Sequence, residues 1–226
     1  MERNPFVAFI FGPPGSGKST QADFVAREYG AVHFNTGEVL REILYNPKNA
    51  GDPKIQAERA VHDAGKLNDP TWVREIVVRE LERLAQAGKS MVFSGSPRTL
   101  IEADFELPVF QRLYKGRIFL VVLEITEATT MFRNSHRKIC ERCGKIIPWN
   151  LETQKYLVCP ACGGGLITRP DDEPEVIVKR LQVYKQQIVP TIHYLEKNGV
   201  VSIRIDGEGS PDEVSSLIKS KMDTLL

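Results

Sequence analysis

The chain has 226 residues, of which 26% are charged and 42% are hydrophobic, and its formal net charge is +1. Such a chain can bury one good core and carry a small inserted module. A net charge this close to zero gives no strong attraction to nucleic acid or to anionic membranes, so neither is expected as a partner. The apolar run Phe6–Phe11 is too short for a signal peptide or for the ~20 residues that span a bilayer. The expected location is therefore the cytoplasm.

Short apolar runs rich in Val, Ile and Phe alternate with helical patterns along the chain. The runs predict buried strands at 6–11, 31–34, 90–93, 118–125 and 200–205. Helices are predicted at 17–29, 36–44, 53–64, 71–87, 100–114, 127–137, 175–198 and 211–225. This alternation indicates an α/β fold with a parallel sheet covered on both faces. Pro190 lies inside the 175–198 helix and is expected to kink it.

Two segments interrupt the alternation and are predicted to be inserts. Residues 35–68 form a helical excursion, and residues 134–170 hold all four cysteines and have little helical pattern. The predicted core then comprises residues 1–34, 69–133 and 171–226.

The stretch after the first strand, Gly12 to Thr20, fits the pattern G-x-x-x-x-G-K-[ST]. Glycines let backbone N–H groups turn toward a phosphate, and the N-terminus of the following helix adds partial positive charge. Lys18 would reach the β- and γ-phosphates, and a hydroxyl of Ser19 or Thr20 would face Mg²⁺. The predicted triphosphate-binding residues are Gly12, Gly15, Ser16, Gly17, Lys18, Ser19 and Thr20.

The four cysteines form two close pairs, Cys140-x-x-Cys143 and Cys159-x-x-Cys162, separated by fifteen residues. Four thiolates at this spacing favour a tetrahedral structural Zn²⁺. The module is too small to bury a core, so the metal is expected to fold it. Disulfides and free thiols are the alternatives. A nucleic-acid-binding ribbon is disfavoured because the module has few basic residues and no basic stripe.

Further segments accompany the phosphate loop: Phe34–Arg41, Ala64–Leu67, Gly95–Thr99, Arg169–Asp172 and Arg180-Leu181-x-x-Tyr184. Together, over nearly the whole chain, they resemble the signatures of the adenylate kinase family in its long, zinc-lid form. The resemblance implies a P-loop NTPase-type three-layer fold with a five-stranded parallel sheet. It also implies that 35–68 is the insert that binds a nucleoside monophosphate (NMP) and that 134–170 is a zinc-ribbon lid.

The resemblance implies the Mg²⁺-dependent reaction ATP + AMP ⇌ 2 ADP, carried out by a monomer. By matching position, Lys18 would hold the transferred phosphoryl group, while Thr36, Arg41 and Arg98 would bind the monophosphate. Backbone near Lys66 and Gly95 would line the base pocket. The lid arginines that would converge on the phosphates are Arg133, Arg137, Arg169 and Arg180, the first two of which also contact ATP. Arginines suit this task because each can grip phosphate oxygens with two N–H groups.

The sequence departs from the family pattern at three informative places. Ser19-Thr20 stands where the family has Gly-Thr, so either hydroxyl could face Mg²⁺. Ser94 replaces an Asp that supports hydrated Mg²⁺, so weaker Mg²⁺ handling or a slower rate is expected. Glu102 replaces a Gln that reads adenine, and an ionised carboxylate only accepts hydrogen bonds. AMP is the favoured acceptor, with GMP, CMP or UMP as alternatives. A catalytically weak nucleotide-binding homologue is the other alternative.

A GTPase function for the phosphate loop and a catalytic role for the histidines are both less favoured. No Asn-Lys-x-Asp motif is present to support a GTPase. The four histidines lie apart in the sequence and are predicted to have surface or packing roles.

Overall fold

A computed structural model describes residues 4–63, 66–150, 152–168 and 172–226. Its centre is a five-stranded sheet in the order β2-β3-β1-β4-β8, and every pairing in it is parallel. The strands are β1 (Val7–Phe11), β2 (Val32–Phe34), β3 (Met91–Ser94), β4 (Ile118–Glu124) and β8 (Val201–Asp206). Each lies within one residue of a predicted strand, so the predicted parallel sheet is confirmed.

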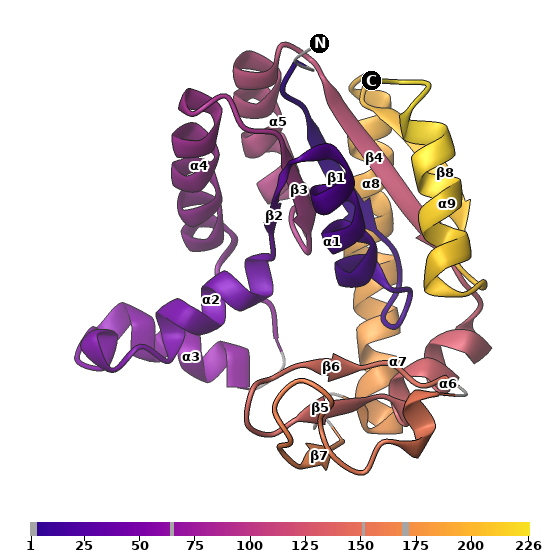
Figure 1. The fold of residues 1–226 in the computed structure, drawn as a ribbon. Helices are drawn as coiled ribbons and strands as arrows, with labels where there is room; N and C mark the ends of the chain where they lie inside the picture. Colours follow the sequence, from indigo (N-terminus) through magenta and orange to yellow (C-terminus); the bar gives the residue numbers. More distant parts are fainter. Residues whose placement is uncertain (1–3, 64–65, 151, 169–171) are drawn as a thin grey trace.

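Helices cover both faces of this sheet and make the three-layer α/β fold that was predicted (Figure 1). The helices around the sheet are α1 (Lys18–Tyr29), α4 (Pro70–Gln86), α5 (Leu100–Tyr114), α8 (Val189–Lys197) and α9 (Pro211–Met222). Side chains of β1 alternate between two cores: Val7 and Phe9 pack in the cluster that includes α4, α5 and α8 residues, and Ala8 and Ile10 pack in the cluster of α1 and α9. A strand buried on both faces explains why its sequence is continuously apolar.

The segment after β2 runs away from the sheet as α2 (Thr36–Leu44), a 3₁₀ turn (Pro47–Asn49) and α3 (Pro53–Asp63) (Figure 1). Helix α2 begins where it was predicted because Asn35 caps it, its side chain accepting from the Glu38 N–H. Buried Asn68 fixes the return to the core: its Nδ2 donates to the Glu58 backbone oxygen at 2.8 Å and to its carboxylate at 2.9 Å. Ala64 and Gly65, part of one family signature, lie outside the described residues.

A second excursion follows α6 (Glu127–His136), which packs against α7 (Pro174–Val183). It contains a small antiparallel sheet in the order β6-β5-β7, formed by β5 (Lys138–Cys140), β6 (Ile146–Ile147) and β7 (Leu166–Ile167), and a 3₁₀ turn (Thr153–Lys155). These short strands were not predicted, because two or three residues carry no readable period. The domain limits at 35–68 and 134–170 stay a proposal.

Where a single kinked helix was predicted over 175–198, α7 passes through a π-helical turn (Tyr184–Ile188) into α8. The irregularity directly precedes Pro190, which has no N–H to donate and whose ring would clash with the carbonyl four residues back in a regular helix. Among the described residues, no helix is both long and apolar enough to cross a membrane.

Candidate functional site

The phosphate loop joins the carboxyl end of β1 to the first residue of α1, Lys18. Gly15 has a positive φ of 79°, and a Cβ there would lie 2.6 Å from Nδ2 of Asn134 on α6. Only glycine therefore lets the loop approach α6 this closely. The Lys18 ammonium donates to the backbone oxygens of Gly12 and Pro13, both at 2.9 Å. Buried Asn134 was not predicted as part of this region.

Lys18 lies in a strongly cationic environment. Burial and the charges of Arg180, Arg98 and Arg137, with burial the largest cause, together lower the pKa of Lys18 to about 7. These three arginines come from α7, from the segment after β3 and from the end of α6. The fold thus gathers four cationic groups that are distant in the sequence, and an anion placed among them would be strongly stabilised.

A single buried carboxylate holds two of the predicted lid arginines. Asp172 is 2% exposed and accepts from Arg137 Nε at 2.6 Å and from its Nη2 at 2.5 Å. Arg180 Nη1 donates to the same Asp172 Oδ1 at 3.2 Å. Sequence reasoning named both arginines but did not foresee the carboxylate between them. Its acidic neighbours in the sequence gave the only hint.

Arg133, the other described lid arginine, points elsewhere. Its Nη1 donates to the Gly207 oxygen at 2.8 Å, and its Nη2 donates to the oxygens of Glu208 and Gly209 at 2.8 and 3.2 Å. Here it binds the loop between β8 and α9 instead of the cluster around Lys18. Arg169 lies outside the described residues.

The predicted monophosphate side centres on Arg98, whose Nε donates to the Gly95 oxygen at 2.5 Å. Burial lowers the pKa of Arg98, and the charge of Arg41 lowers it further, although Glu102 opposes them. The charge of Arg41 thus acts on Arg98, and their shared role in binding the monophosphate stays a prediction. Lys66 is solvent-exposed, and its backbone N–H donates to the Val61 oxygen at 3.2 Å.

Two hydroxyls predicted to face phosphates are buried without a hydrogen-bond partner among the described residues: Ser16 Oγ in the phosphate loop and Thr36 Oγ1 at the start of α2. Buried polar groups are nearly always paired, so an orphaned hydroxyl indicates a missing partner. Phosphate oxygens would supply that partner at both positions.

Glu102, at the position predicted to read the base, is 3% exposed. Its Oε2 accepts from the Arg98 backbone N–H at 2.7 Å and from Ser96 Oγ at 3.4 Å. Burial raises the pKa of Glu102, and the Arg98 N–H opposes that rise. One turn further along α5, fully buried Glu106 has no hydrogen-bond partner among the described residues for either carboxyl oxygen, and burial raises its pKa well above the ordinary value. Sequence reasoning missed Glu106, because acidic residues on a helix are ordinarily exposed and nothing local shows that the face it shares with Glu102 is buried.

His33, for which a surface or packing role was predicted, is hydrogen-bonded at both ring nitrogens. Its Nε2 lies 2.7 Å from Ser94 Oγ, and its Nδ1 lies 2.6 Å from Asp23 Oδ1. The residues belong to β2, β3 and α1. The contact between His33 and Ser94, which are 61 residues apart in the chain, follows from the adjacency of the parallel strands β2 and β3. A chain-order reading without the strand order could not reveal it.

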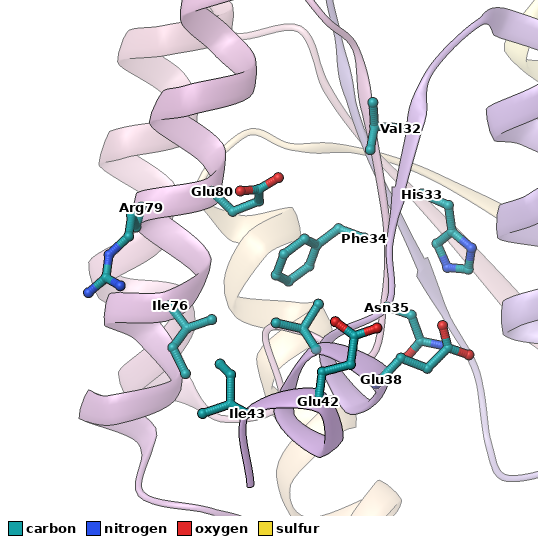
Figure 2. Close-up of a pocket in the computed structure, with 11 residues that line it drawn as sticks. Val32, His33, Phe34, Asn35, Glu38, Glu42, Ile43, Ile76, Arg79 and Glu80 are labelled. Atoms are coloured by element: carbon teal, nitrogen blue, oxygen red, sulfur yellow. The ribbon is translucent and has the colours of Figure 1, made fainter. Parts of the chain in front are cut away.

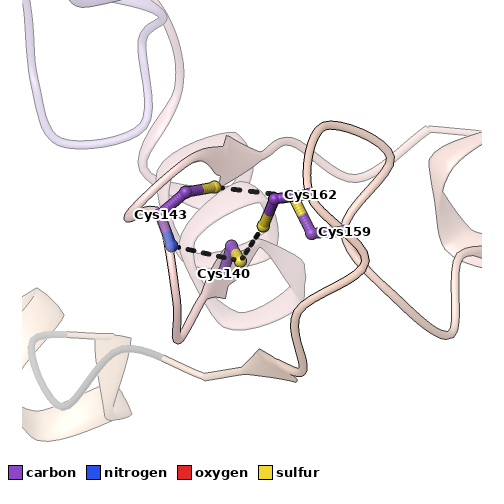
Figure 3. A group of neighbouring side chains, drawn as sticks. All are labelled: Cys140, Cys143, Cys159 and Cys162. Atoms are coloured by element: carbon purple, nitrogen blue, oxygen red, sulfur yellow. Dashed lines mark hydrogen bonds between the residues drawn. The ribbon is translucent and has the colours of Figure 1, made fainter.

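The four cysteines lie together in the small antiparallel sheet region (Figure 3). Their Sγ atoms all lie within 4.8 Å of one another, with Cys140–Cys162 at 3.4 Å and Cys143–Cys159 at 3.7 Å. These separations are far longer than a disulfide bond. The Cys143 backbone N–H lowers the pKa of the Cys140 thiol to about 6. Gly144 and Gly163, each directly after a cysteine pair, have positive φ. The cluster is compatible with a tetrahedral zinc site.

A separate pocket of about 470 Å³ lies between β2, α2 and α4 (Figure 2). Its lining includes Phe34, Glu38, Glu42, Ile76 and Arg79. None of the residues predicted to bind nucleotide lines it, so it lies apart from the cationic cluster.

A parallel sheet whose first strand opens into such a loop places the protein in the class of phosphate-loop nucleotide-binding α/β proteins. A family model described as adenylate kinase matches residues 10–200. The chain is 35% identical to the adenylate kinase of Petrotoga mobilis over 207 residues, covering 91% of this chain and 92% of the relative. It is also 35% identical to that of Pyrococcus abyssi over 218 residues (95% and 94%), and 32% identical to that of Chlamydia trachomatis over 216 residues (90% and 85%). The chain therefore belongs to the adenylate kinase family.

Proposed function

We propose that this protein is a nucleoside monophosphate kinase that catalyses ATP + AMP ⇌ 2 ADP. The observation that carries the proposal is the set of arginines whose charges act on Lys18, namely Arg98, Arg137 and Arg180, the last two of which are held together by Asp172. Phosphoryl transfer needs little covalent help from a protein but needs neutralisation of charge on the phosphate oxygens. A cationic cluster beside a phosphate loop is the arrangement that supplies it.

The proposed roles follow from position. The phosphate loop and Lys18 hold the triphosphate of ATP, and Arg41, Arg98 and Thr36 hold the monophosphate. An oxygen of the monophosphate attacks the γ-phosphorus in line while the bond to the β-phosphate oxygen breaks, and two diphosphates result. Arg137, with Arg133, Arg169 and Arg180, neutralises the transferred group as residues 134–170 close and exclude water.

Mg²⁺ and Zn²⁺ are the proposed metals. Hydroxyl oxygens fit a hard cation such as Mg²⁺, and Ser16, Ser19, Thr20 and Ser94 supply them at or beside the phosphate loop. Bound with ATP, Mg²⁺ neutralises charge on the β- and γ-phosphate oxygens. The four thiols fit Zn²⁺, which would fold the lid and take no part in the chemistry because four protein ligands leave no open position.

AMP is the proposed acceptor, and buried Glu102 supports a competing proposal. An ionised carboxylate accepts the N6–H of adenine but repels its N1, whereas guanine presents N–H donors at N1 and N2. One oxygen of Glu102 already accepts two hydrogen bonds from the protein. A kinase that prefers GMP, CMP or UMP is the alternative that this residue favours.

The test is ADP formation from ATP with AMP, GMP, CMP or UMP in parallel, compared as kcat/KM. Arg137→Ala should lower the AMP rate by about 10³-fold, by analogy with other arginines that stabilise transferred phosphoryl groups. Arg112→Ala is the matched control, because that arginine is exposed and pairs only with Glu82 at 3.4 Å among the described residues. ATP binding without ADP formation from any monophosphate would establish the non-catalytic homologue instead.

A further inference from the structure

Three hydrogen-bonded side chains, Asp23, His33 and Ser94, connect three elements behind the phosphate loop. Asp23 lies on α1, His33 on the edge strand β2, and Ser94 at the carboxyl end of β3. Figure 2 shows His33 leaving β2 on the side opposite to Phe34, whose ring packs in the core with α4 and α5. His33 therefore faces α1, and its side chain is only 14% exposed.

With Asp23 ionised and the His33 ring neutral, the chemistry of the three groups fixes the direction of the hydrogen bonds. An ionised Asp23 carboxylate can only accept, so Nδ1 of His33 must carry the proton and donate it. In the neutral ring Nε2 is then an acceptor, and the Ser94 hydroxyl donates to it. The Ser94 hydrogen is thereby turned toward His33, and its lone pairs are left to accept a hydrogen bond from elsewhere.

Ser94 lies where a nucleotide-bound cation would be expected. It pairs in register with Ile10 of β1, two residues before the phosphate loop begins at Gly12. The next residue, Gly95, accepts from Arg98. The hydroxyl thus lies at the carboxyl end of the parallel strands. It is beside the strand that leads into the loop proposed for the triphosphate, and one residue before the glycine that contacts the arginine proposed for the monophosphate. It is 4% exposed, so its acceptor lone pairs lie in a partly dry environment.

We propose that Asp23 and His33 are positioning residues that hold the Ser94 hydroxyl as a hydrogen-bond acceptor for water bound to the Mg²⁺ of MgATP. The inference rests on the proposed kinase function. A serine alone has no charge and a freely rotating hydroxyl, which makes it a weak substitute for a carboxylate. The His33 bond fixes the rotor, and Asp23 fixes the ring by accepting from its Nδ1. The Asp23 carboxylate, whose side chain is 71% exposed, retains a solvent-screened negative charge two side chains further from the metal.

The test is calorimetric binding of ATP with and without Mg²⁺, which needs no turnover. Asp23→Asn and Ser94→Ala should each reduce the gain in ATP affinity that Mg²⁺ provides by about 3- to 10-fold. Metal-free ATP affinity should change by less than about 2-fold. The double variant should lose no more than Ser94→Ala alone, because the two residues act as one unit. In the Asp23→Asn background, Ser94→Asp should restore the gain.

Glu28→Gln is the matched control, since it removes a carboxylate from the same helix that pairs with Lys219 of α9. It should leave the Mg²⁺ gain unchanged. Additive losses in the Asp23 and Ser94 double variant, or an equal loss of metal-free ATP affinity, would overturn the inference and leave only a structural role. Absence of phosphoryl transfer in the unaltered protein would refute the proposed function instead, and the Mg²⁺ dependence of ATP binding would still be measurable.

Discussion

Binding of a nucleoside triphosphate should draw a proton onto Lys18. Burial and three nearby arginines lower its pKa from an ordinary 10.5 to about 7, so about half of the free molecules carry an uncharged lysine at pH 7. Phosphate oxygens beside the amine favour its charged form. ATP binding should therefore take up about 0.5 proton per molecule at pH 7, about 0.9 at pH 8 and about 0.1 at pH 6, as the titration curve of one such group requires.

Isothermal titration calorimetry in buffers of different ionisation enthalpy measures this uptake directly. At pH 8 the terminal phosphate, with a second pKa near 6, is almost fully ionised and contributes little of its own. Lys18→Arg is the matched control, because arginine keeps the charge and does not titrate in this range. The difference between the two proteins isolates the lysine.

An uptake at pH 8 that is the same in both proteins would refute the reasoning, since Lys18 would then be charged before ATP arrives. The linked effect on stability has a definite sign. The unfolded chain keeps this proton up to pH 10.5, whereas the fold releases it near pH 7. The unliganded protein should therefore gain stability as the pH rises between these values, and Lys18→Arg should not show that gain.

Three further changes test other parts of the site. Asp172→Asn removes the charge that holds Arg137 and Arg180, and should lower the free energy of unfolding, measured in urea, by about 2 kcal/mol. This loss is smaller than for a fully buried ion pair because both arginines are partly exposed. An unchanged midpoint would contradict this. Glu102→Gln should raise the AMP-to-GMP ratio of kcat/KM by about 10- to 100-fold, because an amide both donates and accepts; a constant ratio would show that Glu102 does not contact the base. A strong chelator should remove stoichiometric zinc and unfold residues 138–165 before the core, which limited proteolysis would detect; no bound metal and an unchanged digestion pattern would count against the zinc site.

Most of the sheet could be predicted because its strands are short, apolar and buried on both faces. The phosphate loop could be predicted equally well, since Gly12, Gly17 and Lys18 have a fixed spacing that the anion-binding geometry requires. The cysteine cluster followed from the same kind of local spacing. In each case the chemistry is encoded within a few consecutive residues.

What the sequence did not reveal depends on contacts between distant elements. Asp172 is recognisable as an anchor only once α6 and α7 bring Arg137 and Arg180 to it. The link between His33 and Ser94 requires the strand order, because β2 and β3 are neighbours in the sheet but not in the chain. Glu106 is buried because its position on α5 faces the packed core, although charged residues are ordinarily exposed to solvent.

The helical run from α7 through the π-helical turn to α8 has two parts with different roles: α8 packs in the core, and α7 presents Arg180. Ile192 and Leu195 of α8 pack in the hydrophobic core, and Arg180 lies on α7, before the π-helical turn of the same helical run. The segment that contains the four cysteines lies between α6 and α7 in the chain and does not form part of this helical run. The loops of this segment can therefore vary in length or in their metal ligands across evolution, or be exchanged by protein engineering. The helical run would still hold the Arg180 guanidinium in the same position.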